Sequence, residues 1–220
     1  LRRTAAWGLS EYADNDIAGK ALTSALVKDK DPAVREMAAW ALGNGDDRSS
    51  ITVDALSNAL HSDANEGVRV TATWALGNIG AEEAVNVLTA AMQDKNKEIR
   101  ARAIWAIGNI GPREAPKSLF QSLRDPDPRI RELSAWALYQ IEDPSAAPAL
   151  NAALQAESIK DLQIAYIRAL AALGEKSVDA IRGLLTSSDP KIKSMAVRAL
   201  AGGNAAGPWP WPWPEPRPYP

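Results

Sequence analysis

The segment Val34-Arg35-Glu36-Met37-Ala38-Ala39-Trp40-Ala41-Leu42-Gly43-Asn44 decides the fold, because the chain repeats its pattern. Segments 68–78, 99–109 and 130–140 carry the same Arg in second place and the same Trp in seventh place. The tryptophans of this register are Trp7, Trp40, Trp74, Trp105 and Trp136, spaced 31 to 34 residues apart. A period of this length is typical of one helical hairpin per repeat.

Two further hairpins continue the series without tryptophan. We expect Ala171 and Arg198 at the positions that Trp occupies in the earlier repeats. The first helix of a hairpin is expected in segments with their own apolar spacing, such as residues 84–92 and 147–154.

The turns between these helices have recognisable capping chemistry. Asp-Pro pairs at residues 31–32, 127–128 and 189–190 place an N-capping carboxylate before a proline at the first helical position. Gly80, Gly111 and Gly174 suit helix C-termini, where a left-handed residue is common. The sequence therefore predicts an all-α fold over residues 1–200, an α-solenoid of antiparallel hairpins that coils as a right-handed superhelix.

Composition narrows the range of functions. A net charge of -2 without a basic stripe argues against a nucleic-acid partner. No apolar run is long enough to cross a bilayer, and no secretory signal is visible at the start. The chain has no cysteine and one histidine, His61, so we expect neither a metal site, nor a cofactor, nor a catalytic constellation. The cellular compartment stays open.

The pattern Val-Arg-x-x-Ala-x-Trp-Ala-Leu-Gly-Asn, followed by Asp-Pro-x-Val-Arg, resembles the HEAT-like repeats of the phycobilisome-lyase type. The resemblance covers residues 1 to about 200 and implies the fold, with an accessory subunit or a bilin-lyase-like enzyme subunit as the alternative function. Di-iron hydroxylases of similar fold need repeated His-Glu pairs, and a single histidine excludes them.

The helical wheel gives the tryptophans a direction. With the Ala three residues after the Arg at zero, the Trp falls at about 200° and the Asn four residues later at about 240°. Both positions point away from the first helix, so we expect a concave face lined by both residue types. Its members are Trp7, Trp40, Asn44, Trp74, Asn78, Trp105, Asn109, Trp136 and Gln140.

Such a face is similar to the Trp and Asn array by which armadillo importins hold extended peptides. A Trp ring offers contact area, and an Asn amide can bind a peptide backbone. The alternative is that the rings pack between repeats. For the repeated arginines Arg35, Arg69, Arg100 and Arg131 we favour a structural role, as bridges to acidic turns such as Asp31 and Asp127.

The C-terminal end differs from the repeats. Residues 201–207 read as a flexible linker, and residues 208–220 alternate with proline, which predicts a polyproline II rod. Its exposed aromatic side chains are typical of a ligand for an aromatic groove. The candidate ligand residues are Trp209, Trp211, Trp213, Arg217 and Tyr219. Docking is possible near the Trp136 position of the same chain, in a second copy, or not at all.

We therefore predict a scaffold that binds an extended, Pro-rich peptide, with its own tail as an intramolecular or intermolecular ligand. The partner is a protein, a peptide or another copy of the chain, and no catalysis is expected. The chain opens with a second helix, residues 1–9, whose first helix is missing, so we expect an N-terminally truncated repeat array. A further alternative is the regulatory C-terminal region of a larger, membrane-anchored bacterial protein.

Overall fold

The computed structural model describes residues 1–202 and Trp209, apart from the side chains of Glu175 and Lys176. The tail residues Trp211, Trp213, Arg217 and Tyr219 and most of the linker lie outside the described residues. The described residues are helical, with short 3-10 turns and no strand, and they belong to two compact units. None of their helices is long and apolar enough to span a membrane.

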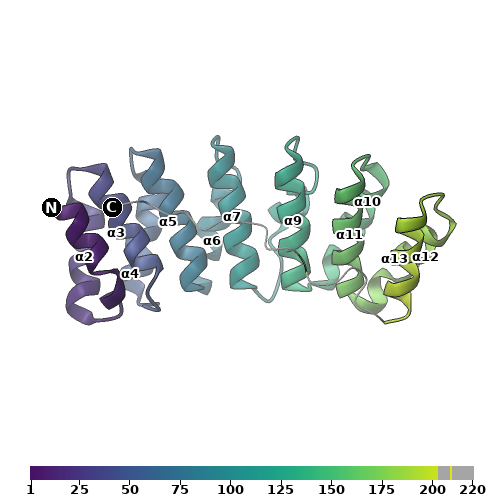
Figure 1. The fold of residues 1–220 in the computed structure, drawn as a ribbon, viewed down its shortest axis with the longest axis horizontal. Coiled ribbons are helices and arrows are strands. Elements are labelled where there is room, and N and C mark those ends of the chain that lie inside the picture. The colour runs from purple at the N-terminus through teal and green to yellow at the C-terminus, as the bar shows by residue number, and fades with distance from the viewer. Residues whose placement is uncertain (203–208, 210–220) are drawn as a thin grey trace. The chain divides into compact units, whose positions relative to one another are not determined.

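The first unit, Leu1–Ile110, is a row of helical hairpins. In α2–α3, α4–α5 and α6–α7 a first helix packs against a second, and the second helices α3, α5 and α7 also pack against one another in order (Figure 1). The helices are α1 (Arg2–Gly8), α2 (Asp16–Lys28), α3 (Pro32–Gly43), α4 (Ser50–Ser62), α5 (Glu66–Ile79), α6 (Val85–Ala91) and α7 (Lys97–Ile110).

The second unit begins at Gly111 and continues the pattern. The hairpins α8–α9, α10–α11 and α12–α13 pack internally, and the second helices α9, α11 and α13 pack in series. The helices are α8 (Lys117–Ser122), α9 (Pro128–Ile141), α10 (Ala147–Ala156), α11 (Lys160–Ala172), α12 (Val178–Gly183) and α13 (Pro190–Leu200). The predicted all-α array of antiparallel hairpins is confirmed.

Capping chemistry sets the helix boundaries, as predicted. The Asp31 and Asp127 carboxylates accept hydrogen bonds from the second backbone N–H after them, and the Asp189 carboxylate accepts two such bonds. Gly80, Gly111 and Gly174 adopt positive φ angles of 61 to 66°, which a side chain would disfavour. The helices that follow an Asp-Pro pair therefore begin through local chemistry that is visible in the sequence.

In the second helices α3, α5, α7, α9 and α11, a polar residue in the first turn closes the turn of its own hairpin. Its side chain donates a hydrogen bond to the backbone carbonyl six residues earlier. The bonds join Arg35 to Asp29 (2.9 Å), Arg69 to Asp63 (2.8 Å), Arg100 to Asp94 (3.0 Å), Arg131 to Asp125 (2.8 Å) and Gln163 to Glu157 (2.7 Å).

The same guanidinium can also hold the carboxylate of the next turn along the chain. The fork of Arg35 binds both oxygens of Asp63 at 2.7 and 2.8 Å. The pairs Arg2–Asp29 and Arg131–Glu157 repeat this arrangement. The structural role expected for the arginines is confirmed, but the predicted partners Asp31 and Asp127 are wrong, because those carboxylates cap helices instead.

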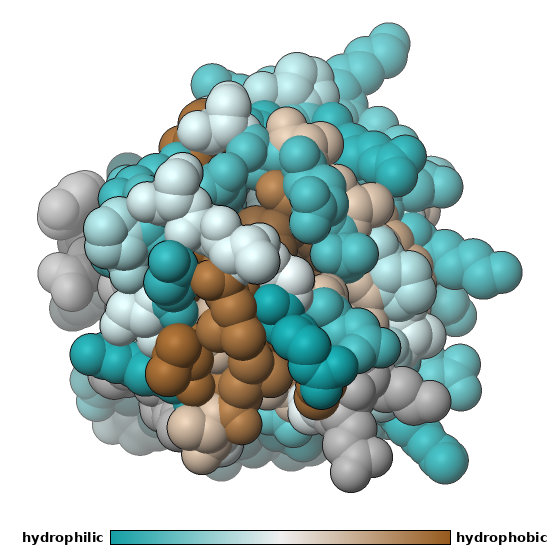
Figure 2. All heavy atoms as spheres, turned by 90° about the vertical axis from the view of Figure 1, so that its right-hand side faces the viewer, coloured by the Kyte–Doolittle hydropathy of each residue, from teal (hydrophilic) through white to brown (hydrophobic). Residues whose placement is uncertain are grey.

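The last hairpin exposes apolar side chains. Val197 and Leu200 of α13 are 53% and 37% exposed, and Figure 2 shows apolar side chains gathered on this end of the second unit. Ile192, Met195 and Ala196 on the other side of α13 are buried. The exposed side of α13 therefore carries apolar side chains, which are uncommon as a group on a solvent-facing helix surface.

The Arg35–Asp63 pair makes stability depend on pH. The hydrogen bond from Arg35 lowers the pKa of the Asp63 carboxyl, although partial burial opposes the shift. Because the folded pKa is lowered, ionised Asp63 stabilises the fold above the ordinary aspartate pKa of about 4, and this contribution disappears as the pH falls through the folded value. We expect the urea midpoint to fall less steeply on acidification in Asp63→Asn than in the wild type. The exposed Asp54→Asn substitution is the control and should keep the wild-type slope.

Candidate functional site

The second-helix face, formed by the Trp and Asn positions of successive repeats, is the predicted site. Trp74, Trp105 and Trp136 are only 3 to 4% exposed. The prediction that these three rings stand open to solvent is therefore wrong. Trp40 is half-buried and Trp7 is 45% exposed, so the rings near the start of the first unit are more accessible.

The rings are buried because successive second helices approach closely at glycine. A Cβ atom on Gly43 of α3 would lie 2.7 Å from the Cζ3 atom of Trp74 and 2.7 Å from Ala75 Cβ of α5. A Cβ on Gly77 of α5 would lie 2.9 Å from Cζ3 of Trp105 in α7. At these two contacts the indole fills the space that the glycine of the preceding repeat leaves, which is the packing alternative considered from the sequence.

Two asparagines add hydrogen bonds to the same helix–helix contact. The Asn78 amide donates to the carbonyl oxygen of Gly43 at 2.8 Å, and the Asn109 amide donates to that of Gly77 at 2.9 Å. Both bonds join a second helix to its predecessor. Asn44 instead donates to Trp40 in its own helix at 2.8 Å. Although these side chains and Gln140 are exposed, as predicted, the donor groups of the asparagines already serve the backbone.

The second unit departs from this pattern. The hydrogen bond from Gln163 fixes the register of α11 and places Arg168 at the position that Trp has in the earlier repeats. The prediction that Ala171 occupies this position is wrong, because Ala171 corresponds to the glycine. By the same register Tyr139 of α9 stands where α3 and α5 have Gly43 and Gly77.

Trp209 contacts Tyr139 and Arg168, the two residues that depart from the repeat pattern. Its ring centre lies 5.5 Å from that of Tyr139, with the planes tilted by 44°. The guanidinium carbon of Arg168 lies 5.5 Å from the centre of the Trp209 ring, within the range of a cation–π interaction. All three side chains are half-exposed.

Sequence reasoning did not assign Tyr139 and Arg168 to a site. The available signal was the change from Leu-Gly-Asn to Leu-Tyr-Gln, together with the loss of Trp in the next repeat. No group of three or more His, Asp and Glu side chains in the described part of the chain is arranged to hold a metal ion. The chemistry of this face is therefore aromatic, cationic and amide contact.

The hairpin array, with its arginine-closed turns and stacked second helices, defines a helical repeat protein. Models of HEAT repeats match residues 19–99, 53–119 and 89–163, so the chain belongs to the HEAT repeat family. No significant match to a curated protein sequence is found.

Solved structures agree with this assignment. The complex of CpcE and CpcF of phycocyanin lyase from Nostoc sp. PCC7120 is 22% identical, with a TM-score of 0.62 over 82% of this chain and 74% of that chain. An engineered protein is 24% identical, with a TM-score of 0.59 over 84% and 97% of the chains. A designed armadillo repeat protein in complex with the peptide (KR)4 is 18% identical, with a TM-score of 0.52 over 91% and 90%. At these identities the likeness concerns the fold.

Two tryptophan substitutions distinguish packing from surface. We expect Trp74→Ala to lower the free energy of unfolding by about 3–5 kcal/mol, because it empties a buried indole site. Trp7→Ala removes a ring that is already 45% exposed and should cost clearly less. Denaturant unfolding measures both. Equal costs would contradict the packing role of Trp74.

Glycine substitutions test the close approach of the helices. A Cβ on Gly77 would lie 2.5 Å from Ala106 Cβ, so Gly77→Ala must separate α5 from α7. Overpacking costs about 1–3 kcal/mol, which outweighs the helix-propensity gain of about 1 kcal/mol. Gly8→Ala in α1 meets no atom within 4 Å and should keep or raise the melting temperature. If Gly77→Ala were as stable as Gly8→Ala, the close approach would be wrong.

Proposed function

We propose that this HEAT repeat protein is an interaction scaffold that binds an extended segment rich in Pro and Trp on its second-helix face. Its own tail is one such ligand. The proposal rests on one observation: Trp209 contacts the ring of Tyr139 in α9 and the guanidinium of Arg168 in α11. The proposed binding site therefore lies where α9 packs against α11, the first second helix without a tryptophan at the repeat position.

The packing of the repeats explains why a Trp side chain can bind between Tyr139 and Arg168. In the first unit the Gly77 position and the Trp105 position form a matched pair, in which an aromatic ring covers the gap next to a bare backbone. In the second unit the same pair is Tyr139 and Arg168, which offers a ring and a cation but no indole. Trp209 supplies the missing aromatic surface, and the face of its ring is suited to a guanidinium.

The conformation expected for the tail lowers the cost of binding. Alternating prolines restrict the chain to extended conformations before it binds, so little conformational entropy is lost. The tail therefore resembles the Pro-rich peptides that dock in aromatic grooves. A designed armadillo repeat protein of similar fold is solved in complex with the peptide (KR)4, which supports peptide binding as a use of this architecture. The tail of this chain is apolar and not basic, so the ligand chemistry proposed here differs.

The experiment compares the full chain with Trp209→Ala and Arg168→Ala. An aromatic pair contributes about 0.5–1.5 kcal/mol and a cation–π contact about 0.5–1 kcal/mol, so either variant should weaken docking by a factor of about 2–10. The indole N–H resonance of Trp209 is the readout in the wild type and in Arg168→Ala. The sedimentation coefficient is measured for every variant, since docking in a second copy changes the mass. Arg198→Ala is the matched control, because it changes the same register position on α13.

The outcomes separate the alternatives. Loss of the Trp209 resonance shift at constant monomer mass would support docking within one chain, and a change of mass would support docking between copies. If Arg168→Ala and Arg198→Ala gave the same spectrum and mass as the wild type, the tail would not be a ligand of this face.

A bilin-lyase-like accessory subunit is the second candidate. Its support is the likeness in fold to the CpcE and CpcF complex, at 22% identity. The proposal assigns no catalytic step to the described residues. Titration of the purified chain with a free bilin, followed by visible absorbance, tests this candidate independently of the tail variants.

A further inference from the structure

The series of arginines paired with turn carboxylates is interrupted at Arg69. Arg35 binds both oxygens of Asp63, and Arg2 does the same with Asp29. The next arginine in the first unit, Arg69, donates one hydrogen bond, to the carbonyl oxygen of Asp63. No salt bridge joins Arg69 to a carboxylate among the residues described. The carboxylate that the register offers, Asp94, accepts the usual turn bond from the backbone N–H of Asn96 at 2.7 Å and none from Arg69.

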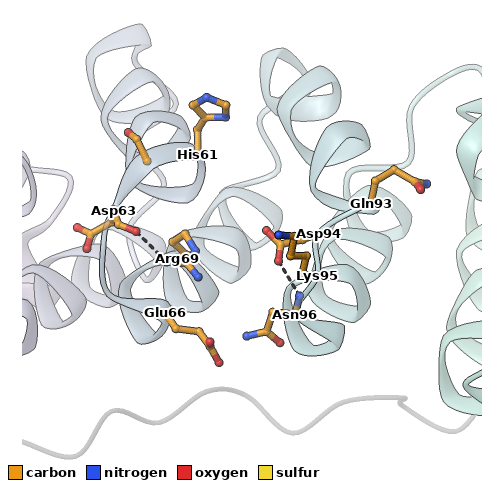
Figure 3. Close-up of a pocket in the computed structure, with 9 residues that line it drawn as sticks. His61, Asp63, Glu66, Arg69, Gln93, Asp94, Lys95 and Asn96 are labelled. Atoms are coloured by element: carbon orange, nitrogen blue, oxygen red, sulfur yellow. Dashed lines mark hydrogen bonds between the residues drawn. The ribbon is translucent and has the colours of Figure 1, made fainter.

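A cavity of about 670 Å³ opens at this position, between the turn of the α4–α5 hairpin and the turn of the α6–α7 hairpin (Figure 3). It lies wholly within the first unit. Its lining comes from the end of α4, the start of α5 and the turn between α6 and α7. It includes His61, Asp63, Glu66, Arg69, Gln93, Asp94 and Lys95. The volume is large enough for a side chain of a partner molecule.

The cavity is lined by two cations, Arg69 and Lys95, and by the carboxylates of Asp63, Glu66 and Asp94. Arg69, Lys95 and the amide of Gln93 present N–H groups. Both carboxylate oxygens of Asp63 are already held by Arg35, at 2.7 and 2.8 Å. Glu66 extends away from Arg69 (Figure 3). Asp94 accepts a bond from the backbone N–H of Asn96, as Asp63 does from that of Asn65.

We propose that this cavity binds a carboxylate side chain of an acidic partner segment, which takes the place of the missing turn carboxylate beside Arg69. The neighbouring repeats supply the argument. At Arg2, Arg35 and Arg131 the equivalent position holds a carboxylate with two N–H···O bonds. The planar guanidinium can bind both oxygens of a carboxylate, and Lys95 adds a second positive charge to the lining.

The site is distinct from the second-helix face and does not depend on the tail. A single exposed ion pair is weak, so the carboxylate acts as one anchor among several contacts of an extended partner. The charge makes the contact sensitive to salt, since exposed pairs are screened over about 8–10 Å at physiological ionic strength.

The experiment uses two short capped peptides, Gly-Glu-Gly-Glu-Gly and Gly-Gln-Gly-Gln-Gly, titrated into the full chain at low ionic strength. The side-chain Nε–H resonance of Arg69 reports binding. We expect the Glu peptide to shift this resonance saturably and the Gln peptide to leave it unchanged. Inorganic phosphate is titrated in parallel, and a larger shift at lower concentration would overturn the carboxylate assignment in favour of a phosphate site.

Variants complete the test, with affinity followed through backbone resonances of residues 93–96. Arg69→Gln should weaken binding of the Glu peptide about fivefold, as expected for loss of an exposed charged pair. Arg124→Gln removes an exposed arginine of the second unit and should change nothing. Asp94→Asn removes the competing negative charge and should tighten binding. Equal binding of the two peptides, unchanged affinity in Arg69→Gln or weaker binding in Asp94→Asn would each overturn the proposal.

Discussion

Close packing of successive second helices at glycine is the contact on which the first unit depends. Gly43 and Gly77 bring the next helix near enough for an indole to cover the bare backbone. The same approach places the Asn78 and Asn109 amides within reach of the glycine carbonyls. In Leu76-Gly77-Asn78 the three residues therefore provide a core side chain, the contact point for α7 and a hydrogen bond to α3. Such nearest-neighbour contacts are what stabilise a repeat array.

Local features of the fold could be predicted from the sequence because their causes are local. The Asp-Pro helix starts and the left-handed glycines depend on residues within one turn of each other, and the repeat period can be read from the spacing of the tryptophans. The closing of each turn by arginine also recurs with the repeat. Its carboxylate partner was missed, because Asp63 belongs to the next hairpin and is 28 residues away from Arg35.

The tryptophan face could not be predicted from one helix. The wheel angle correctly turned Trp74 away from its first helix, but a position that faces away from one neighbour can still be covered by another. Whether it is covered depends on the distance between second helices, which Gly43 sets and a helical wheel ignores. The register of the last repeats failed for a related reason. Without Trp as a marker, Arg168 and Ala171 could be distinguished only through the hydrogen bond of Gln163.

In a repeat protein each repeat can be compared with the others, so a residue that departs from the shared pattern can be recognised. Positions that keep the pattern satisfy their own groups: indole meets glycine, amide meets carbonyl, and guanidinium meets carboxylate. Two positions do not. At Tyr139 and Arg168 the indole comes from Trp209, far along the chain. At Arg69 the fork keeps its turn bond but has no bidentate carboxylate of the kind that Arg35 holds. Substitutions that leave a structural group without its usual partner create a place for a partner of the same chemistry. Binding sites in this scaffold are therefore expected where the repeat is incomplete and not where it is best preserved.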